Sequence, residues 1–204
     1  MPRPSIVVFD LGRVLLDWDP RHLYRKLFDD EARMEAFLRD VCNIAWITQL
    51  DHAATFAEGV AAHVEKFPEH ADAIRAYDER WLETLAGPIA GSVAALEAIQ
   101  QAGIPTYCIT NYPADKFELS RPVYPFLDSF DGIVVSGRER ITKPDPAIYR
   151  LLFERYDLDP ADCIFIDDSL PNIETAKALG MDTHHFLGVE GLRAALRARG
   201  LPTG

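Results

Sequence analysis

Short apolar runs alternate along the chain with segments in which apolar residues recur at helical spacing. The runs are rich in β-branched residues and are bounded by residues that interrupt regular structure. They cover residues 6–9, 104–110, 132–136 and 163–167, with a weaker fifth run at 182–187. Short, continuously apolar runs of this kind are typical of strands buried on both faces of a parallel sheet.

The segments between these runs predict helices. Val93, Leu96 and Ile99 would share one helix face, and Gly103 would end that helix. Two further sets show the same spacing: Ile148, Leu151, Leu152 and Tyr156, and Ile173, Ala176, Lys177 and Leu179. Strands that alternate with helices predict an α/β fold with a parallel sheet and right-handed crossovers.

The stretch from about residue 20 to residue 85 departs from this alternation, because every pattern in it is helical. Its apolar positions are Phe56, Val60, Val64 and Phe67, followed by Ile74, Tyr77, Trp81 and Leu85. We therefore expect a core formed by residues 1–16 and 88–204, with a helical insert formed by residues 17–87. Such inserts often act as lids over a site, and a purely structural bundle is the alternative.

Composition and charge indicate a soluble globular protein. Of the 204 residues, 48% are hydrophobic and 26% are charged, as in ordinary soluble domains. The net charge of −11 disfavours a nucleic-acid-binding surface, and no apolar run approaches the ~20 residues of a membrane span. Three scattered cysteines and the lack of a recognisable secretion signal favour a cytoplasmic location. No feature of the sequence indicates an oligomeric state.

Polar side chains follow three of the predicted strands at their carboxyl ends. They are Asp10 after the first strand, Thr110 and Asn111 after the second, and Asp167, Asp168 and Ser169 after a later one, with Lys143 in a turn before a predicted helix. Singly, each group has a structural explanation as a turn residue or a helix cap. Because ligands bind beyond the carboxyl ends of parallel strands, we expect these groups to form one site there.

These residue types suit phosphoryl transfer. Clustered carboxylates favour a hard cation such as Mg²⁺, which would neutralise the repulsion between Asp10 and an anionic phosphate. Asp10 could then form an aspartyl-phosphate that water hydrolyses. Thr110 and Lys143 could hold the phosphoryl oxygens, and Lys143 could also pair with the carboxylates and keep them ionised.

Four segments resemble the motifs of the haloacid dehalogenase superfamily of phosphatases and dehalogenases, in the same order along the chain. They are residues 9–15 (FDLGRVL), 109–111 (ITN), 143–145 (KPD) and 165–169 (FIDDS) with Asn172. The resemblance covers nearly the whole chain, and the insert resembles the helical cap of that superfamily's first subclass. It implies a doubly wound core with a mobile helical cap over the site.

Carried over residue by residue, the resemblance implies a metal site. Asp10 would be the nucleophile and a metal ligand, and the backbone carbonyl of Gly12 would be a second ligand. Asp168 would be the acidic ligand of the fourth motif, and Asp167 beside it would bind the metal directly or support its ligands. The implied cofactor is Mg²⁺.

The resemblance also implies which groups hold the phosphate. Thr110 and Asn111 would bind the transferred group, and Lys143 would steady the intermediate. Arg13 is a further candidate for binding a substrate anion, with a solvated surface arginine as the alternative.

The chain departs from the superfamily pattern at Gly12. Most of the phosphatases carry there a second aspartate that acts as general acid and base. A carbonyl ligand survives this change, but a proton donor does not, and general acid–base help is typically worth ~10²–10⁴-fold. A substrate whose leaving group needs little protonation would suffer less. Asp17 or Asp19 could substitute, with two exposed hinge aspartates as the alternative.

The sequence therefore predicts a cytoplasmic, Mg²⁺-dependent phosphatase that acts on a small phosphorylated metabolite. The first alternative is a 2-haloacid dehalogenase, which would use Asp10 to attack carbon without a metal. Asp167 and Asp168 disfavour it, since they would repel a carboxylate substrate unless a cation intervened. The second alternative is a non-catalytic member of the fold, which Gly12 permits.

Overall fold

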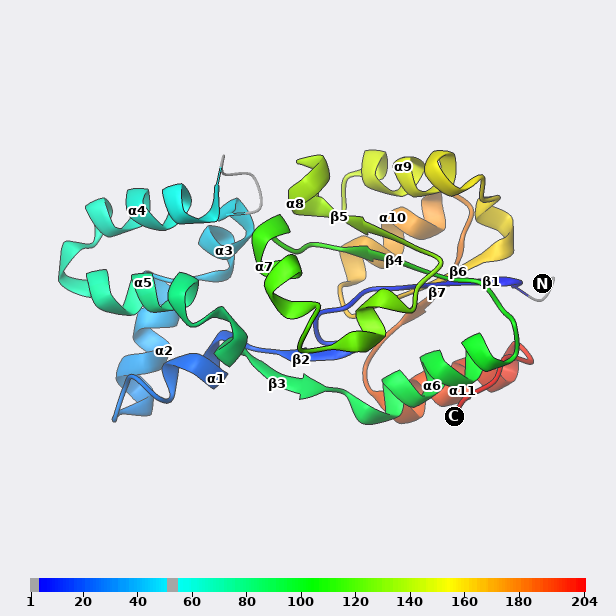
Figure 1. Cartoon of the computed structure of the whole chain (residues 1–204), viewed down its shortest axis with the longest axis horizontal. Helices are drawn as coiled ribbons and strands as arrows, with labels where there is room; N and C mark the ends of the chain where they lie inside the picture. The colour runs from blue at the N-terminus through cyan, green and yellow to red at the C-terminus, as the bar shows by residue number, and fades with distance from the viewer. Residues whose placement is uncertain (1–3, 51–54) are drawn as a thin grey trace.

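A five-stranded parallel sheet forms the centre of the larger of two lobes (Figure 1). The computed structural model describes residues 4–50 and 55–204. The strands are β1 (Ile6–Phe9), β4 (Thr106–Thr110), β5 (Gly132–Val135), β6 (Cys163–Asp167) and β7 (Asp182–His185). Their order in the sheet is β5-β4-β1-β6-β7, so the chain winds outward from β1 first to one side and then to the other. This order confirms the predicted doubly wound α/β fold.

Helices cover both faces of this sheet (Figure 1). They are α6 (Ala90–Gln101) and α11 (Val189–Ala198) on one face, and α9 (Pro146–Tyr156) and α10 (Leu170–Ala178) on the other. Val7 and Phe9 of β1 pack in the apolar cluster that contains α6 and α11, whereas Val8 packs in the cluster that contains α9 and α10. Because successive side chains of a strand point to opposite faces, β1 is apolar throughout and its first polar group comes at its end.

The second lobe is built from the helices between β2 and β3, and we call residues 20–84 the helical lobe (Figure 1). Its elements are α1 (Pro20–Tyr24), α2 (Glu31–Asp40), α3 (Ile44–Leu50), α4 (Phe56–Lys66), α5 (Ala71–Glu79), and the 3₁₀ helices η1 (Pro68–His70) and η2 (Trp81–Thr84). Aromatic rings fill its interior, with Tyr24 stacked on Tyr77 and Trp46 stacked on His63. No helix in the described ranges is long and apolar enough to cross a membrane.

A two-stranded antiparallel ribbon joins the lobes, and the sequence patterns did not predict it. Strand β2 (Leu16–Trp18) pairs with β3 (Leu85–Pro88). The helical pattern expected to continue to Leu85 is therefore wrong at its end, because α5 stops at Glu79 and the chain passes through η2 into β3. Strands this short carry little periodicity of their own, and their pairing depends on a partner far along the chain. The expected division at residues 16/17 and 87/88 falls inside this ribbon.

Short elements flank the strands of the sheet, and the first of them contacts the helical lobe through η2. They are α7 (Ala114–Ser120), α8 (Ser136–Glu139), η3 (Pro125–Asp128) and, at the opposite edge, η4 (Pro160–Asp162). Lys116 of α7 is buried, donates to the Asp78 carbonyl oxygen at 3.1 Å and forms an ion pair with the Asp78 carboxylate on α5. Its ammonium also lies 4.7 Å from the ring centroid of Phe56. This contact holds the two lobes together beside the end of β4.

Gly137 of α8 provides a test of how closely this edge is packed. An added Cβ atom would overlap the Ala114 nitrogen and lie 2.9 Å from the Tyr112 carbonyl oxygen. Because backbone atoms give way less easily than side chains, Gly137→Ala is expected to lower the free energy of unfolding by about 1–3 kcal/mol. Urea denaturation measures this change.

The matched control is Gly191→Ala in α11, where an added Cβ atom meets nothing within 4 Å. This change is expected to raise the free energy of unfolding by about 0.5–1 kcal/mol, since alanine favours a helix interior over glycine. Equal stability of the two variants would contradict the close approach of α8 to the loop after β4.

Candidate active site

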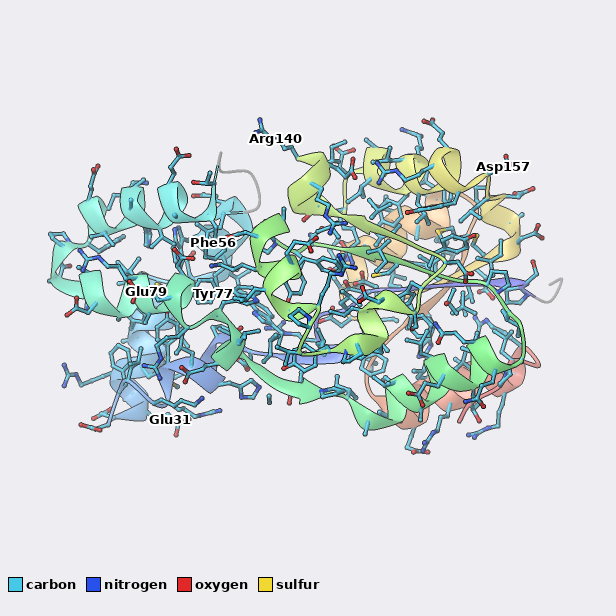
Figure 2. The ribbon with its side chains drawn as sticks, viewed as in Figure 1. Glu31, Phe56, Tyr77, Glu79, Arg140 and Asp157 are labelled. Atoms are coloured by element: carbon cyan, nitrogen blue, oxygen red, sulfur yellow. The ribbon has the colours of Figure 1, made fainter. Side chains whose placement is uncertain are left out.

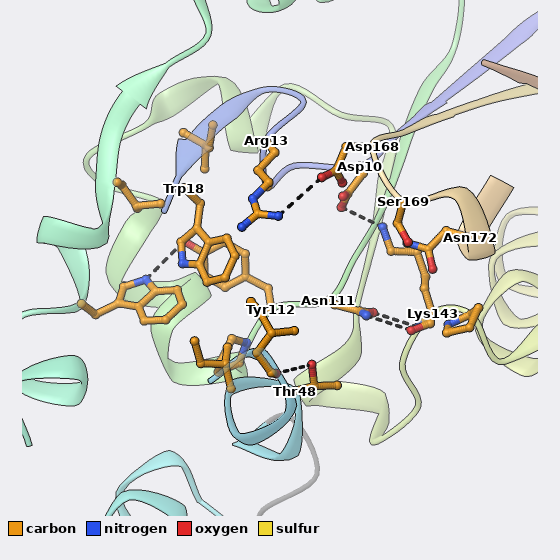
Figure 3. A pocket seen from close by; sticks show the side chains of 18 of the residues that line it. Asp10, Arg13, Trp18, Thr48, Asn111, Tyr112, Lys143, Asp168, Ser169 and Asn172 are labelled. Carbon is orange, nitrogen blue, oxygen red and sulfur yellow. Dashed lines mark hydrogen bonds and ion pairs between the residues drawn. The ribbon is translucent and has the colours of Figure 1, made fainter. Parts of the chain in front are cut away.

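Carboxylates from two neighbouring strands meet at the carboxyl edge of the sheet (Figure 3). Asp10 directly follows β1, Asp167 ends β6 and Asp168 follows it. One oxygen atom from each of the three lies within 4.8 Å of the others. The structure thus brings together three of the residues that the sequence placed at separate strand ends.

Lys143 lies between two of these carboxylates. Its Nζ atom is 2.7 Å from Asp10 Oδ1 and 2.7 Å from Asp167 Oδ2, and the residue is 3% exposed. Burial alone lowers the pKa of Lys143, but the two carboxylates outweigh that effect and raise the pKa above its usual range. The ammonium therefore stays charged and links β1 to β6.

One ammonium does not balance the carboxylates around it. Burial raises the pKa of Asp10 to about 7, and the charges of Asp167 and Asp168 add to this effect while Lys143 opposes it. The pKa of Asp168 is also raised, by burial and then by the charge of Asp167. The site has an excess of negative charge, and its donors are oxygen atoms. This donor set fits a hard divalent cation such as Mg²⁺.

The three carboxylates differ in what they can still bind. Asp10 and Asp168 line a cavity, whereas Asp167 is fully buried and does not. Asp167 Oδ1 accepts from the Ser169 amide at 2.7 Å, and Asn172 donates to both Asp167 oxygens at 3.0 Å. Lys143 also donates to Asp167. These donors fix the Asp167 carboxylate, which in turn positions the Lys143 ammonium. Asp10 and Asp168 are the carboxylates that face the cavity.

The residues after β4 have roles that their sequence pattern did not show. Asn111 lines the cavity, but its Oδ1 accepts from the Lys143 amide at 2.8 Å and its Nδ2 donates to the Lys143 carbonyl at 2.9 Å. Its side chain therefore positions the Lys143 backbone. Thr110 ends β4, is 1% exposed and is not part of the cavity lining. The phosphate-binding roles of both residues remain predictions.

A tight turn after Asp10 presents Gly12 and Arg13 to the cavity. The Leu11 carbonyl accepts from three following amides, and the Arg13 amide donates to the Leu16 carbonyl at 2.7 Å. None of the backbone bonds found in the described chain uses the Gly12 carbonyl. Arg13 has a φ of 60°, and its guanidinium lies 5.1 Å from the Trp18 ring centroid and 4.0 Å from Asp168 Oδ2 (Figure 3).

Asp17 and Asp19 have partners outside the cavity that Gly12 lines. Asp17 Oδ1 lies 3.1 Å from Nε2 of His22, and the Asp19 carboxylate accepts from the Arg21 amide at the start of α1. Neither aspartate is part of the cavity lining. The hinge interpretation of these two residues therefore fits the structure better than the catalytic one.

The cavity has a volume of about 450 Å³ and lies between the carboxylates and the helical lobe. One side of the cavity is apolar, and we call it the apolar wall. It is formed by Trp18, Ile44, Ile47, Phe56, Tyr77 and Trp81. Trp81, one of the apolar positions expected in the helical insert, both packs and lines the cavity. Helical periodicity predicted buried faces for Phe56, Tyr77 and Trp81, but it does not show what such a face encloses. Tyr112 also lines the cavity, and its position directly after Asn111 was an available signal.

Comparison with known proteins agrees with this geometry. A family model described as haloacid dehalogenase-like hydrolase matches residues 4–180. A phosphoglycolate phosphatase of Xylella fastidiosa is 31% identical over 189 residues, which cover 87% of this chain and 78% of that protein. The chain belongs to the haloacid dehalogenase-like hydrolases.

Other relatives match over shorter regions. A sesquiterpene phosphatase of Aspergillus oryzae is 36% identical over 99 residues, or 48% of this chain and 50% of that protein. A 6-phosphogluconate phosphatase of Escherichia coli is 29% identical over 141 residues, or 69% of this chain and 58% of that protein. The match thus spans only about half the length of these two relatives.

Solved structures of haloacid dehalogenase-like enzymes share the fold. A family enzyme from Bacteroides thetaiotaomicron in complex with magnesium superposes with a TM-score of 0.69, at 20% identity and with coverage of 89% of this chain and 92% of that one. L-2-haloacid dehalogenase from Xanthobacter autotrophicus gives a TM-score of 0.64, at 19% identity and with coverage of 97% and 83%. The fold therefore occurs both in a dehalogenase and in an enzyme that binds magnesium, and it does not by itself decide the chemistry.

Asp168→Asn tests whether this haloacid dehalogenase-like site holds a cation. In the metal-free protein the change removes one of the crowded negative charges, so the melting temperature is expected to rise by about 2–4 °C, which corresponds to ~1 kcal/mol in a chain of this size. The affinity for Mg²⁺ is expected to fall about 10–100-fold. Thermal melts across a Mg²⁺ titration measure both effects.

The control for this experiment is Asp29→Asn, which removes an exposed carboxylate of the helical lobe. It is expected to leave the Mg²⁺ response unchanged. If Asp168→Asn retained the same Mg²⁺-induced rise in melting temperature as the wild type, Asp168 would not be a ligand.

Proposed function

We propose that this hydrolase is a Mg²⁺-dependent phosphatase of a small phosphorylated metabolite and that it acts through an aspartyl-phosphate on Asp10. The observation that carries the proposal is the pairing of Asp10 with a buried ammonium at 2.7 Å, beside a second carboxylate, Asp168, that faces the same cavity. A nucleophilic carboxylate needs compensation for its charge before it can approach a phosphate, and this arrangement supplies an ammonium and an oxygen-rich cation site.

The chain's own residues account for the steps. A carboxylate oxygen of Asp10 attacks phosphorus while the bond from phosphorus to the leaving oxygen breaks, which gives an aspartyl-phosphate and an alcohol once a proton is taken up. Lys143 stabilises negative charge near Asp10, and Asn111 holds the Lys143 backbone. Water then attacks the phosphorus of the acyl phosphate, the bond from phosphorus to the Asp10 oxygen breaks, and inorganic phosphate leaves with the Asp10 carboxylate restored. Mg²⁺ held by Asp10, Asp168 and the Gly12 carbonyl would neutralise phosphate charge.

The names of the relatives support cleavage of a phosphate monoester without assigning a substrate. The proteins from Xylella fastidiosa, Aspergillus oryzae and Escherichia coli are each named as phosphatases, but for different substrates. We carry over only the phosphatase activity that these names share. We also propose that the helical lobe covers the bound substrate. The three cysteines are free and buried, in keeping with the cytoplasmic location expected from the sequence.

The dehalogenase alternative is weaker for an electrostatic reason. A 2-haloacid carries its own carboxylate, and it would enter a cavity that already presents Asp10 and Asp168 with raised pKa values. Release of halide from a 2-haloacid in the presence of a chelator would favour that chemistry. A lack of turnover on a broad panel of phosphate esters with Mg²⁺ would favour a non-catalytic role.

Asp10→Asn is expected to preserve the fold and abolish turnover. Asparagine has the same shape, and Lys143 keeps its ion pair with Asp167, so the melting temperature should remain close to that of the wild type. Phosphate release measured with and without Mg²⁺ checks the result, with residual activity below ~1% expected for the loss of a covalent nucleophile. Activity well above that level would contradict an aspartyl-phosphate.

Gly12→Asp is expected to raise activity on simple alkyl phosphates by at least about tenfold, because it supplies the absent general acid. The structure leaves room for the change, since an added Cβ atom meets nothing within 4 Å and the backbone is not in the left-handed region. Gly12→Asn, which has the same size without the acid, is the control and should show no comparable gain. Equal effects of the two substitutions would mean that proton donation is not what the site lacks.

A further inference from the structure

The cavity has two chemically different sides. All of its charged lining residues in the described part of the chain, Asp10, Arg13, Lys143 and Asp168, come from the edge of the sheet or the turn after β1. The helical lobe supplies no charged side chain among the described lining residues and contributes most of the apolar wall. Figure 2 shows Phe56 and Tyr77 on the side of the helical lobe that faces the sheet, whereas Glu31 lies at its outer edge.

The Tyr112 and Thr48 hydroxyls near the apolar wall are already engaged with the protein, whereas Trp18 Nε1 in the wall is buried without a hydrogen-bond partner among the described residues. The Tyr112 hydroxyl lies 2.7 Å from Ser120 Oγ and accepts from Trp81 Nε1 at 3.3 Å. The Thr48 hydroxyl donates to the Ile44 carbonyl at 2.9 Å within α3. The two hydroxyls therefore offer little to a ligand that carries several hydroxyls of its own, and the Trp18 indole adds a single donor and no acceptor.

The wall also includes apolar surface that the protein itself does not cover. Ile44 at the start of α3 lines the cavity and is 54% exposed. Large apolar side chains gain free energy when they leave water, so an apolar ligand group against Ile44 would be stabilised. The volume of about 450 Å³ is within the range of pockets that enclose small organic ligands.

We propose that the organic part of the substrate is apolar, an aliphatic or aromatic group that lies against the apolar wall while its phosphate meets Asp10 and Lys143. This inference rests on the phosphatase function proposed above and narrows its substrate class. Hydroxyl groups of a sugar or polyol buried here would lose more hydrogen bonds to water than the single Trp18 N–H could replace, which disfavours them. Hydrocarbon groups lose nothing of that kind and gain from burial.

Binding of n-alkylphosphonates tests the inference without turnover, because the carbon–phosphorus bond is stable to a phosphatase. Calorimetric titration of the wild-type protein with methyl-, butyl-, hexyl- and octylphosphonate in the presence of Mg²⁺ gives a series of Kd values. The Kd is expected to fall about two- to fourfold for each added methylene until the cavity is filled. A Kd that does not change with chain length would overturn the inference.

A matched pair of variants locates the binding surface. Ile44→Ser is expected to reduce the gain per methylene and to raise the Kd of octylphosphonate at least about fivefold, with little effect on methylphosphonate. Val123→Ser removes a β-branched residue that is 49% exposed and outside the cavity lining, and it should leave the whole series unchanged. The same effect from both variants would overturn the assignment to the apolar wall.

Turnover separates this inference from the proposed function. The kcat/KM of n-hexyl phosphate is expected to exceed that of a hexitol 6-phosphate at least about tenfold, and both release a primary alcohol, so Gly12 affects them alike. Turnover that favours the hexitol ester would overturn the apolar substrate class and leave the phosphatase function standing. Chain-length-dependent phosphonate binding without hydrolysis of any ester would support the apolar wall and overturn the phosphatase function. If the protein neither binds the phosphonates nor hydrolyses any ester, both the apolar substrate class and the phosphatase function are overturned.

Discussion

The ammonium of Lys143, buried between the carboxylates of Asp10 and Asp167, is the interaction on which the site depends. It joins two adjacent strands to the loop before α9, and it is 2.7 Å from each partner. Taking one partner from a buried ion pair leaves an uncompensated charge, which is typically far more costly than losing a surface pair. The surrounding bonds follow from this need: Asn111 holds the Lys143 backbone, and Asn172 holds Asp167.

The same site carries more negative charge than its lysine neutralises. Burial raises the pKa values of Asp10 and Asp168, and the neighbouring carboxylates add to that rise. Such crowding lowers the stability of the metal-free protein, and it is retained where function needs it. A divalent cation would offset this excess, so the crowding that destabilises the metal-free site suits it to the phosphatase function proposed above.

The two lobes contribute different physical properties to one cavity. The carboxyl edge of the sheet supplies charge held by short, rigid strands, and the helical lobe supplies apolar surface with no charged group among its described lining residues. Rigid placement matters for chemistry, because small displacements of reacting groups cost rate. Apolar contact is less directional, so the wall can select a substrate class by burial without sharing in the reaction.

The sequence by itself determined the parallel sheet, the helical insert and the polar groups at the strand ends, because periodicity and strand-end position are local properties of the chain. It did not show that Asp167 accepts hydrogen bonds from Asn172 and Ser169, or that Thr110 is buried. It also did not show the ribbon of β2 and β3, or that Trp81 lines a cavity. Only the tertiary structure decided these features, because each depends on partners from distant segments, and a periodic pattern shows that a side chain is buried without showing what it contacts.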